Sequence, residues 1–162
     1  MKIKLRNMTS VYFVRDTEIL FLYRIGSRVA NKKFVGAAGG HFEPEELNDP
    51  YICILREMQE ELGLLPSDVE ELRLRYVTHR LMGDEIRQNY YFFGRLKENR
   101  ELSSTEGELH WISFSDVPKL DMPLSAKHMI LHYLEQGRCN ETLYGGITEE
   151  SGTNFIPMRS FE

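Results

Sequence analysis

Three glutamates that lie close together in the sequence are the residues of this chain best suited to chemistry. Glu57, Glu60 and Glu61 stand at i, i+3 and i+4, so on an α-helix their carboxylates share one patch of surface. Oxygen ligands with no histidine or cysteine among them select Mg²⁺, Mn²⁺ or Ca²⁺ over zinc or copper. Because Mg²⁺ usually completes its shell with water and substrate phosphate, the cluster predicts a phosphate-bearing substrate.

Two neighbouring features complete the pattern of a metal site. The pair Gly39-Gly40 lacks β-carbons, so its backbone can approach a metal or a pyrophosphate closely, and we expect it to form a loop. Arg56 lies at i, i+4 from Glu60 and is expected to hold that carboxylate in a metal-binding rotamer. The sequence therefore predicts a divalent-metal site beside a phosphate-binding loop.

The glutamates need a helix to position them, and the flanking residues mark its ends. Asp49 followed by Pro50 predicts a helix start, with the aspartate as N-cap and the proline at N1, and Gly63 suits the C′ position. An apolar stripe on roughly the opposite face is predicted to enter the core. Its members are Tyr51, Leu55, Met58 and Leu62.

The rest of the chain interleaves strand and helix patterns, which predicts an α/β or α+β layer structure. Residues 10–14 and 19–23 indicate a hairpin, and residues 72–82 and 85–96 two long strands joined at Gly83-Asp84. A short strand is expected over 109–114, a second helix from Pro123 to Gly137, and a terminal hairpin around 148–152. Segments 24–33 and 98–106 are polar and are predicted to be loops.

Composition limits the classes of function. The 162 residues suit one domain, which we expect to span 1–162, with a core that needs no disulfide. The formal net charge is −5 at pH 7, which argues against binding to a nucleic acid polymer. No apolar stretch is long enough to span a bilayer or to serve as a secretory signal, so no membrane association is expected. Cys53 and Cys139 have no zinc spacing, which predicts reduced thiols in a cytoplasmic protein, with Cys53 in the core.

The glycines, the arginine and the glutamates together resemble the signature of the Nudix hydrolases, G-x5-E-x7-R-E-U-x-E-E-x-G-U, in which U is a bulky aliphatic residue. Its slots are filled in order by Gly40, Glu46, Arg56, Glu57, Met58, Glu60, Glu61, Gly63 and Leu64. One departure is clear, because nine residues separate Glu46 from Arg56 where the pattern has seven. The insertion leaves Glu45 as an alternative for the role of Glu46.

The resemblance covers about Met8 to Gly137 and implies a fold and an activity. The fold would be the family's α/β/α sandwich around a mixed central sheet. The activity would be a Mg²⁺-dependent pyrophosphohydrolase of the MutT-like type, with Mn²⁺ as an alternative ion, acting as a monomer or homodimer. It would cleave a nucleoside diphosphate linked to a moiety X. The expected substrate is a nucleoside triphosphate, normal or oxidised, which would give the monophosphate and pyrophosphate. Alternatives are ADP-ribose, a nucleotide sugar, a dinucleotide, or a nucleotide-sensing module without turnover.

Site roles follow from the same resemblance. Glu57, Glu60, Glu61 and the Gly40 carbonyl would ligate metal, Arg56 would support them, and Glu57 is the first choice for general base. Glu101, Glu106 and Glu108 are loop alternatives for the base, of which Glu108 is placed first because it leads the strand toward Trp111. Candidate substrate contacts are Gly39, His41, Trp111 and Arg28. Arg28 is chosen from the basic residues that could border the metal site, which are Arg24, Arg28, Lys32, Lys33 and Arg87. For Trp111, burial in the core is the competing interpretation.

Overall fold

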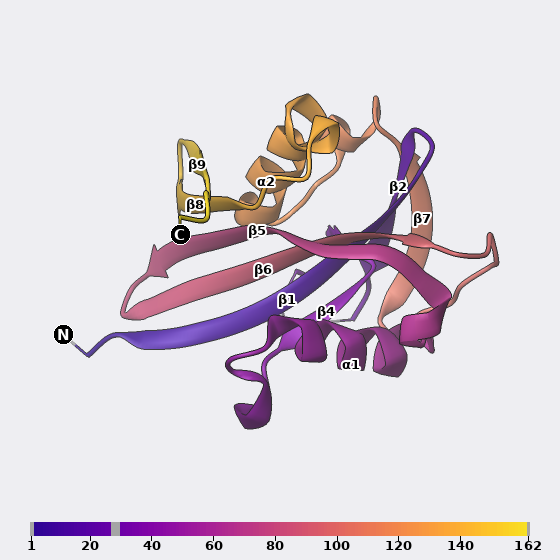
Figure 1. Ribbon diagram of the computed structural model, residues 1–162, viewed down its shortest axis with the longest axis horizontal. Coiled ribbons are helices and arrows are strands. Elements are labelled where there is room, and N and C mark those ends of the chain that lie inside the picture. Colours follow the sequence, from indigo (N-terminus) through magenta and orange to yellow (C-terminus); the bar gives the residue numbers. More distant parts are fainter. Residues whose placement is uncertain (1, 27–29, 162) are drawn as a thin grey trace.

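A mixed sheet of nine strands lies between two helices in the computed structural model, which describes residues 2–26 and 30–161 (Figure 1). Helix α1 (Pro50–Leu62) covers one face, and helix α2 (Leu124–Glu135) covers the other. The strands are β1 (Lys4–Arg15), β2 (Glu18–Arg24), β3 (Phe34–Gly36), β4 (Ala38–His41), β5 (Val69–Met82), β6 (Glu85–Leu96), β7 (Gly107–Ser113), β8 (Tyr144–Glu149) and β9 (Gly152–Pro157). The sandwich prediction is thereby confirmed.

The sheet has the order β3-β2-β1-β6-β5-β8-β9, with β4 paired to β1 and β7 paired to β2. Strands β1 and β6 run parallel at its centre, and β5 and β8 are also parallel, whereas the other pairs are antiparallel. The predicted hairpins β1–β2, β5–β6 and β8–β9 are all present. The metal-site glycines sit in β4, against the central strand β1.

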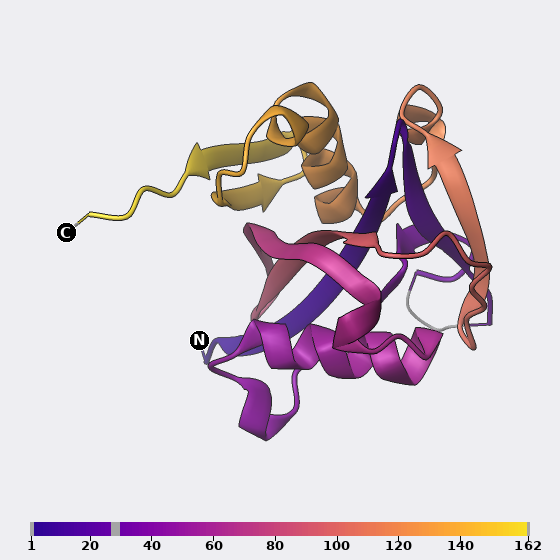
Figure 2. The same cartoon turned by 45° about the vertical axis from the view of Figure 1, so that its right-hand side comes forward.

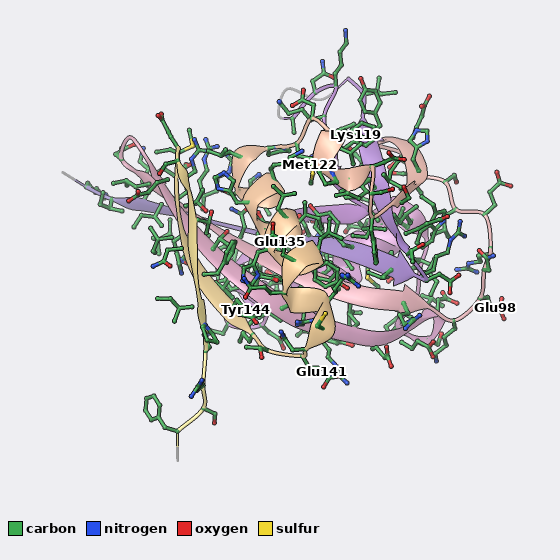
Figure 3. All side chains as sticks on the ribbon, turned by 90° about the horizontal axis from the view of Figure 1, so that it is seen from above. Glu98, Lys119, Met122, Glu135, Glu141 and Tyr144 are labelled. Carbon is green, nitrogen blue, oxygen red and sulfur yellow. The ribbon has the colours of Figure 1, made fainter. Side chains whose placement is uncertain are left out.

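Each face of the sheet has its own apolar core. Under α1, the side chains of Ile54 and Met58 pack on those of Val11 and Phe13. Under α2, the side chain of Met129 packs with aromatic rings from the strands, among them Tyr12, Phe21, Tyr76, Tyr91 and Phe93. Figure 3 shows α2, marked by Glu135, lying across this face beside β8, marked by Tyr144. No helix in the described part of the chain is long and apolar enough to cross a membrane.

Helix α1 begins and ends as the sequence predicts. The Asp49 carboxylate accepts hydrogen bonds from the backbone N–H groups of Tyr51 and Ile52. Gly63 follows the helix with a φ of 67°, in the left-handed region that glycine adopts without strain. These two caps set the length of α1.

Three expectations need correction. The predicted Gly-Gly loop is instead strand β4, because its backbone pairs with β1. Strand β1 begins at Lys4 rather than Ser10, because the parallel partner β6 extends it through polar residues. The apolar stripe of α1 is rotated: Tyr51 is exposed, and the buried face includes Cys53, Ile54 and Glu57.

Candidate metal centre and active site

Strand β4 brings the backbone of Gly40 against the carboxylate of Glu57 on α1. A Cβ atom on Gly40 would lie 2.3 Å from Glu57 Oε1, so only glycine leaves room for this carboxylate. The register of β4 with β1, which pairs Gly40 with Thr9 and Gly39 with Ser10, sets the position of both glycines. Glycine is therefore required here for close approach of a side chain to the backbone.

Arg56 is the centre of the carboxylate cluster. Its guanidinium donates to both oxygens of Glu46, from Nε at 2.9 Å and from Nη2 at 2.8 Å. Its Nη1 donates to Glu57 at 2.9 Å and to Glu60 at 3.1 Å. A further bond from Nη2 to the His41 carbonyl ties α1 to the end of β4. One planar side chain thus orients three carboxylates.

Glu46, rather than Glu45, fills the second slot of the motif. Its side chain is 2% exposed, and hydrogen bonding by Arg56 lowers the pKa of this carboxyl. Glu45 is exposed. The inserted pair of residues is absorbed between the short 3-10 turn Pro44–Glu46 and the N-cap, so the insertion does not separate Glu46 from Arg56.

Glu61 faces the glycine strand in a half-buried position. The Gly39 N–H group donates to Glu61 Oε2 at 3.3 Å. Burial, followed by the nearby charge of Glu57, raises the pKa of Glu61 to about 8. The Glu106 carboxylate raises it further, and Arg24 acts in the opposite direction. Negative charge at Glu61 therefore lacks sufficient compensation from the protein's own cations.

These features fit a divalent cation. The carboxylates of Glu57, Glu60 and Glu61 and the Gly40 carbonyl are all oxygen donors, the kind that Mg²⁺ and Mn²⁺ take. As the side chains stand, residues 2–26 and 30–161 contain no group of three His, Cys, Asp or Glu side chains close enough to hold a metal ion. Arg56 Nη1 binds Glu57 and Glu60, while Glu61 bonds to Gly39, so rotations of these side chains are needed to gather the donors.

The uncompensated charge predicts a pH dependence of stability in EDTA. Because the pKa of Glu61 is raised on folding, its contribution to stability is full below the unfolded pKa near 4.5 and is lost as pH rises through about 8. The free energy of unfolding of Glu61→Gln, relative to the native chain, is therefore expected to rise over this window. Urea unfolding of both proteins at several pH values measures it, and a constant difference would contradict the assignment.

A cavity of about 300 Å³ opens beside the cluster, lined by residues of the sheet and of the start of α2. Figure 2 shows α1 and α2 on opposite faces of the sheet. Gly39, Gly40, His41 and Glu61 line one side of the cavity. Nε2 of His41 lies 2.9 Å from Nη2 of Arg6. Burial, followed by the charge of this guanidinium, lowers the pKa of the imidazole. A neutral His41 accepts this hydrogen bond, which agrees with a lining residue rather than a base.

The structure separates the three loop glutamates, of which Glu101 is exposed. The Glu106 carboxylate lies 3.5 Å from Arg24 Nη2, and both residues act on the pKa of Glu61. The Glu108 side chain is 66% exposed and lies 3.4 Å from His110 Nε2. Of the loop candidates, the structure therefore brings Glu106 to the cluster and leaves Glu108, which the sequence placed first among the three, on the surface of β7.

Of the other residues considered from the sequence, Arg24 and Arg87 line the cavity, whereas Trp111 and Cys53 do not. Trp111 packs against the core under α1, with the Arg15 guanidinium 4.0 Å from its ring centroid, and it does not line the cavity. Arg28 lies outside the described residues. Cys53 is buried, and burial raises the pKa of its thiol to about 11, so it is inert core as expected. Neither Cys53 nor Cys139 forms a disulfide in the structure.

The sequence pattern did not identify several cavity residues. Arg6, Arg80 and Asn89 come from central strands, and Ser125 from α2. Their types are common on protein surfaces, and only the pairing of strands distant in sequence brings them to one cavity. The two-residue period of a strand, which places Arg6 on the same face of β1 as Met8, is the one signal that could have assigned Arg6 to a face.

Comparison with known proteins extends these observations. The family model described as the NUDIX domain matches residues 4–133. A MutT protein from Bacillus halodurans has a TM-score of 0.67 at 19% identity, covering 94% of this chain and 97% of that one. A NUDIX hydrolase from Nitrosomonas europaea has a TM-score of 0.66 at 16% identity, covering 91% and 81%. An Ap4A hydrolase from C. elegans has a TM-score of 0.64 at 13% identity, covering 85% and 100%. No sequence match was found among curated proteins.

Proposed function

The chain belongs to the Nudix hydrolase family, and we propose that it is a Mg²⁺-dependent pyrophosphohydrolase that cleaves a nucleoside diphosphate linked to a moiety X. A nucleoside triphosphate is the simplest member of this substrate class and is the first to test. The proposal concerns one domain over 1–162 in the cytoplasm. Mn²⁺ is the alternative ion.

One observation carries the proposal: the Arg56-centred carboxylate cluster lies against β4 beside a cavity. Glu57 and Glu60 share Arg56 Nη1, and Glu61 receives the Gly39 N–H group. The cavity reaches Gly39, Gly40 and Glu61, so a substrate bound there can extend its diphosphate to the carboxylates. A phosphate needs such a cation site because carboxylates alone would repel it.

The protein's residues would divide the work as follows. Glu57, Glu60, Glu61 and the Gly40 carbonyl would hold the cation, and Arg56 would keep Glu57 and Glu60 oriented. When bound, Mg²⁺ screens phosphate charge and lowers the pKa of water. The backbone of β4 would guide the diphosphate past the carboxylates, because the glycines leave no side chain in its path.

The general base is proposed from the same geometry. Glu57 is the first choice, since its carboxylate is held by Arg56 and packs against Gly40. Among the loop carboxylates, Glu106 replaces Glu108 as the second choice, because Glu106 acts on Glu61 whereas Glu108 pairs with His110. Glu106→Gln against Glu108→Gln separates the two, with loss of turnover expected only in the former.

A substrate panel tests the proposed function. Release of phosphate or pyrophosphate would be measured from nucleoside triphosphates, normal and oxidised, and from nucleotide sugars, ADP-ribose and dinucleotides, each with Mg²⁺ and with EDTA. Turnover that EDTA abolishes is expected for at least one class, and its products identify X. A folded protein that binds nucleotides in calorimetry but turns over none of them would instead be a nucleotide-sensing module.

A matched pair of glycine variants probes the β4 contact. In Gly40→Ala the new Cβ meets the end of the flexible Glu57 side chain, so we expect the fold to persist and turnover to fall by about 10²-fold. In Gly39→Ala the new Cβ would lie 2.2 Å from the Thr9 carbonyl oxygen, which is backbone. That variant is expected to lose stability as well, by about 1–3 kcal/mol. Thermal unfolding and kinetics of both variants check this, and full activity of Gly40→Ala would contradict the role of Glu57.

A further inference from the structure

Three arginines from the central strands of the sheet line the cavity. Arg6 on β1 pairs with Arg87 on β6, and Arg87 pairs with Arg80 on β5. Side chains of directly paired residues lie on the same face of a sheet. The three side chains therefore form a row across adjacent strands, named here the arginine row, and all three line the cavity.

The arginine row is poorly balanced by acidic groups. Glu85 Oε1 lies 2.9 Å from Arg87 Nε and 3.8 Å from Arg6 Nη1, so one carboxylate serves two guanidiniums. Arg80 has no ion pair with any residue of the described chain, and it is partly buried. Neighbouring strands are about 4.8 Å apart, so these like charges repel one another. In a chain of net charge −5, such a local excess of positive charge is favourable for an anionic ligand.

The position of the arginine row relative to the carboxylates sets the shape of that ligand. Arg6 precedes Ser10 by four residues on β1, and Ser10 pairs with Gly39. At about 3.3 Å per residue, the Cα atom of Arg6 is roughly 13 Å along the strand from Gly39. The Arg6 guanidinium lies closer to Gly39 than its backbone does, because Nη2 is 2.9 Å from Nε2 of His41, which pairs with Met8. The cavity joins both ends, so one molecule can contact Gly39 and the row together.

We propose that the arginine row binds a second anionic group of the substrate, a phosphate separated from the scissile diphosphate by about the length of one ribose. This inference rests on the proposed function. It narrows the substrate to one that carries a further phosphate, either on X or on the nucleoside. Guanidinium groups donate planar pairs of N–H bonds that match phosphate oxygens. Hydrolysis breaks one P–O bond of the diphosphate by addition of water, and the second phosphate leaves unchanged on one product.

Matched substrates that differ by one phosphate test the arginine row. The pairs are NADPH and NADH, coenzyme A and 3′-dephospho-coenzyme A, and 2′-phospho-ADP-ribose and ADP-ribose. For the pair that the enzyme turns over best, kcat/KM with Mg²⁺ is expected to favour the phosphorylated member by about tenfold or more. Arg80→Gln, which leaves no ion-pair partner behind, is expected to remove most of that preference through KM.

Arg95→Gln is the matched control, because Arg95 lies on β6 with Arg87 but at the other end of the strand and outside the cavity. It changes net charge equally, so general charge effects appear in both variants. We expect Arg95→Gln to keep the preference. Equal loss in Arg80→Gln and Arg95→Gln, or equal kcat/KM for both members of every pair in the native enzyme, would overturn the inference and leave the proposed function intact.

Binding without turnover keeps the inference testable if hydrolysis fails. Calorimetry in EDTA would compare adenosine 2′,5′-bisphosphate and adenosine 3′,5′-bisphosphate with adenosine 5′-monophosphate. At least one bisphosphate is expected to bind about tenfold tighter, an advantage that Arg80→Gln removes and Arg95→Gln keeps. Absence of that advantage in the native chain would reject the arginine row as an anion site, whereas absence of EDTA-sensitive turnover on the full panel would reject the proposed function alone.

Discussion

Replacement of Glu60 by glutamine is expected to lower metal-dependent turnover by about 10²- to 10³-fold without unfolding the protein. The Glu60 side chain is 58% exposed, and its one side-chain partner among the described residues is Arg56 at 3.1 Å. A neutral amide of the same shape keeps the volume and can still accept from Arg56. It loses the charge that a divalent cation requires, so the effect falls on the metal rather than on the fold.

Two measurements separate these effects. The free energy of unfolding of Glu60→Gln, measured with urea in EDTA, is expected to differ from that of the native chain by no more than about 0.5 kcal/mol, the range of exposed substitutions. The Mg²⁺ concentration that gives the half-maximal rate is expected to rise. Glu135→Gln on α2 is the control, because Glu135 is an exposed helical glutamate on the opposite face of the sheet. A Glu60→Gln enzyme with native turnover would remove Glu60 from the metal site.

Replacement of Arg56 by methionine is expected to destabilise the protein by about 3–5 kcal/mol and to abolish turnover. The Glu46 carboxylate is 2% exposed and takes both of its short ion-pair bonds from Arg56. Removal of one partner leaves a buried charge without compensation, which costs far more than the pair contributes. Turnover is lost because Glu57 and Glu60 lose their common donor.

A double-mutant cycle isolates the pair. Arg56→Met combined with Glu46→Gln is expected to be less unstable than the two single effects added together, with a coupling energy of about 1–3 kcal/mol in urea unfolding. Glu45→Gln, next to Glu46 but exposed, is expected to show no coupling to Arg56. Arg56→Lys keeps the charge but not the planar pair of bonds, so it is expected to recover little of the loss. Additive effects of Glu46 and Arg56 would contradict the ion-pair assignment.

Sequence patterns predicted the parts of the fold that local rules determine. The N-cap at Asp49, the C′ glycine at Gly63 and the turn at Gly83-Asp84 all depend on neighbouring residues, and all were predicted correctly. Strand β4 and the start of β1 were missed because they depend on pairing between distant segments. The rotation of the buried face of α1 was missed because Gly40, on a strand distant in sequence, leaves room for the polar side chain of Glu57 to be buried.

The candidate site divides in the same way. Arg56, Glu57, Glu60 and Glu61 belong to one helix, so their spacing alone brought them together. The pairing of Arg56 with Glu46 and the choice between Glu106 and Glu108 required the orientation of loops, which spacing does not encode. The arginine row required the register of β1, β6 and β5, and no motif connects its members.

The parallel pairing of β1 with β6 also sets when the molecule can fold. Lys4 is opposite Glu85, so the central pair of strands joins segments roughly 80 residues apart. Closure of so long a loop comes before its contacts can stabilise it, which slows folding. On the ribosome, β1 is synthesised first, and it cannot pair with β6 until β6 has emerged. During that interval its apolar residues Val11, Tyr12 and Phe13 are open to chaperones or to other nascent chains.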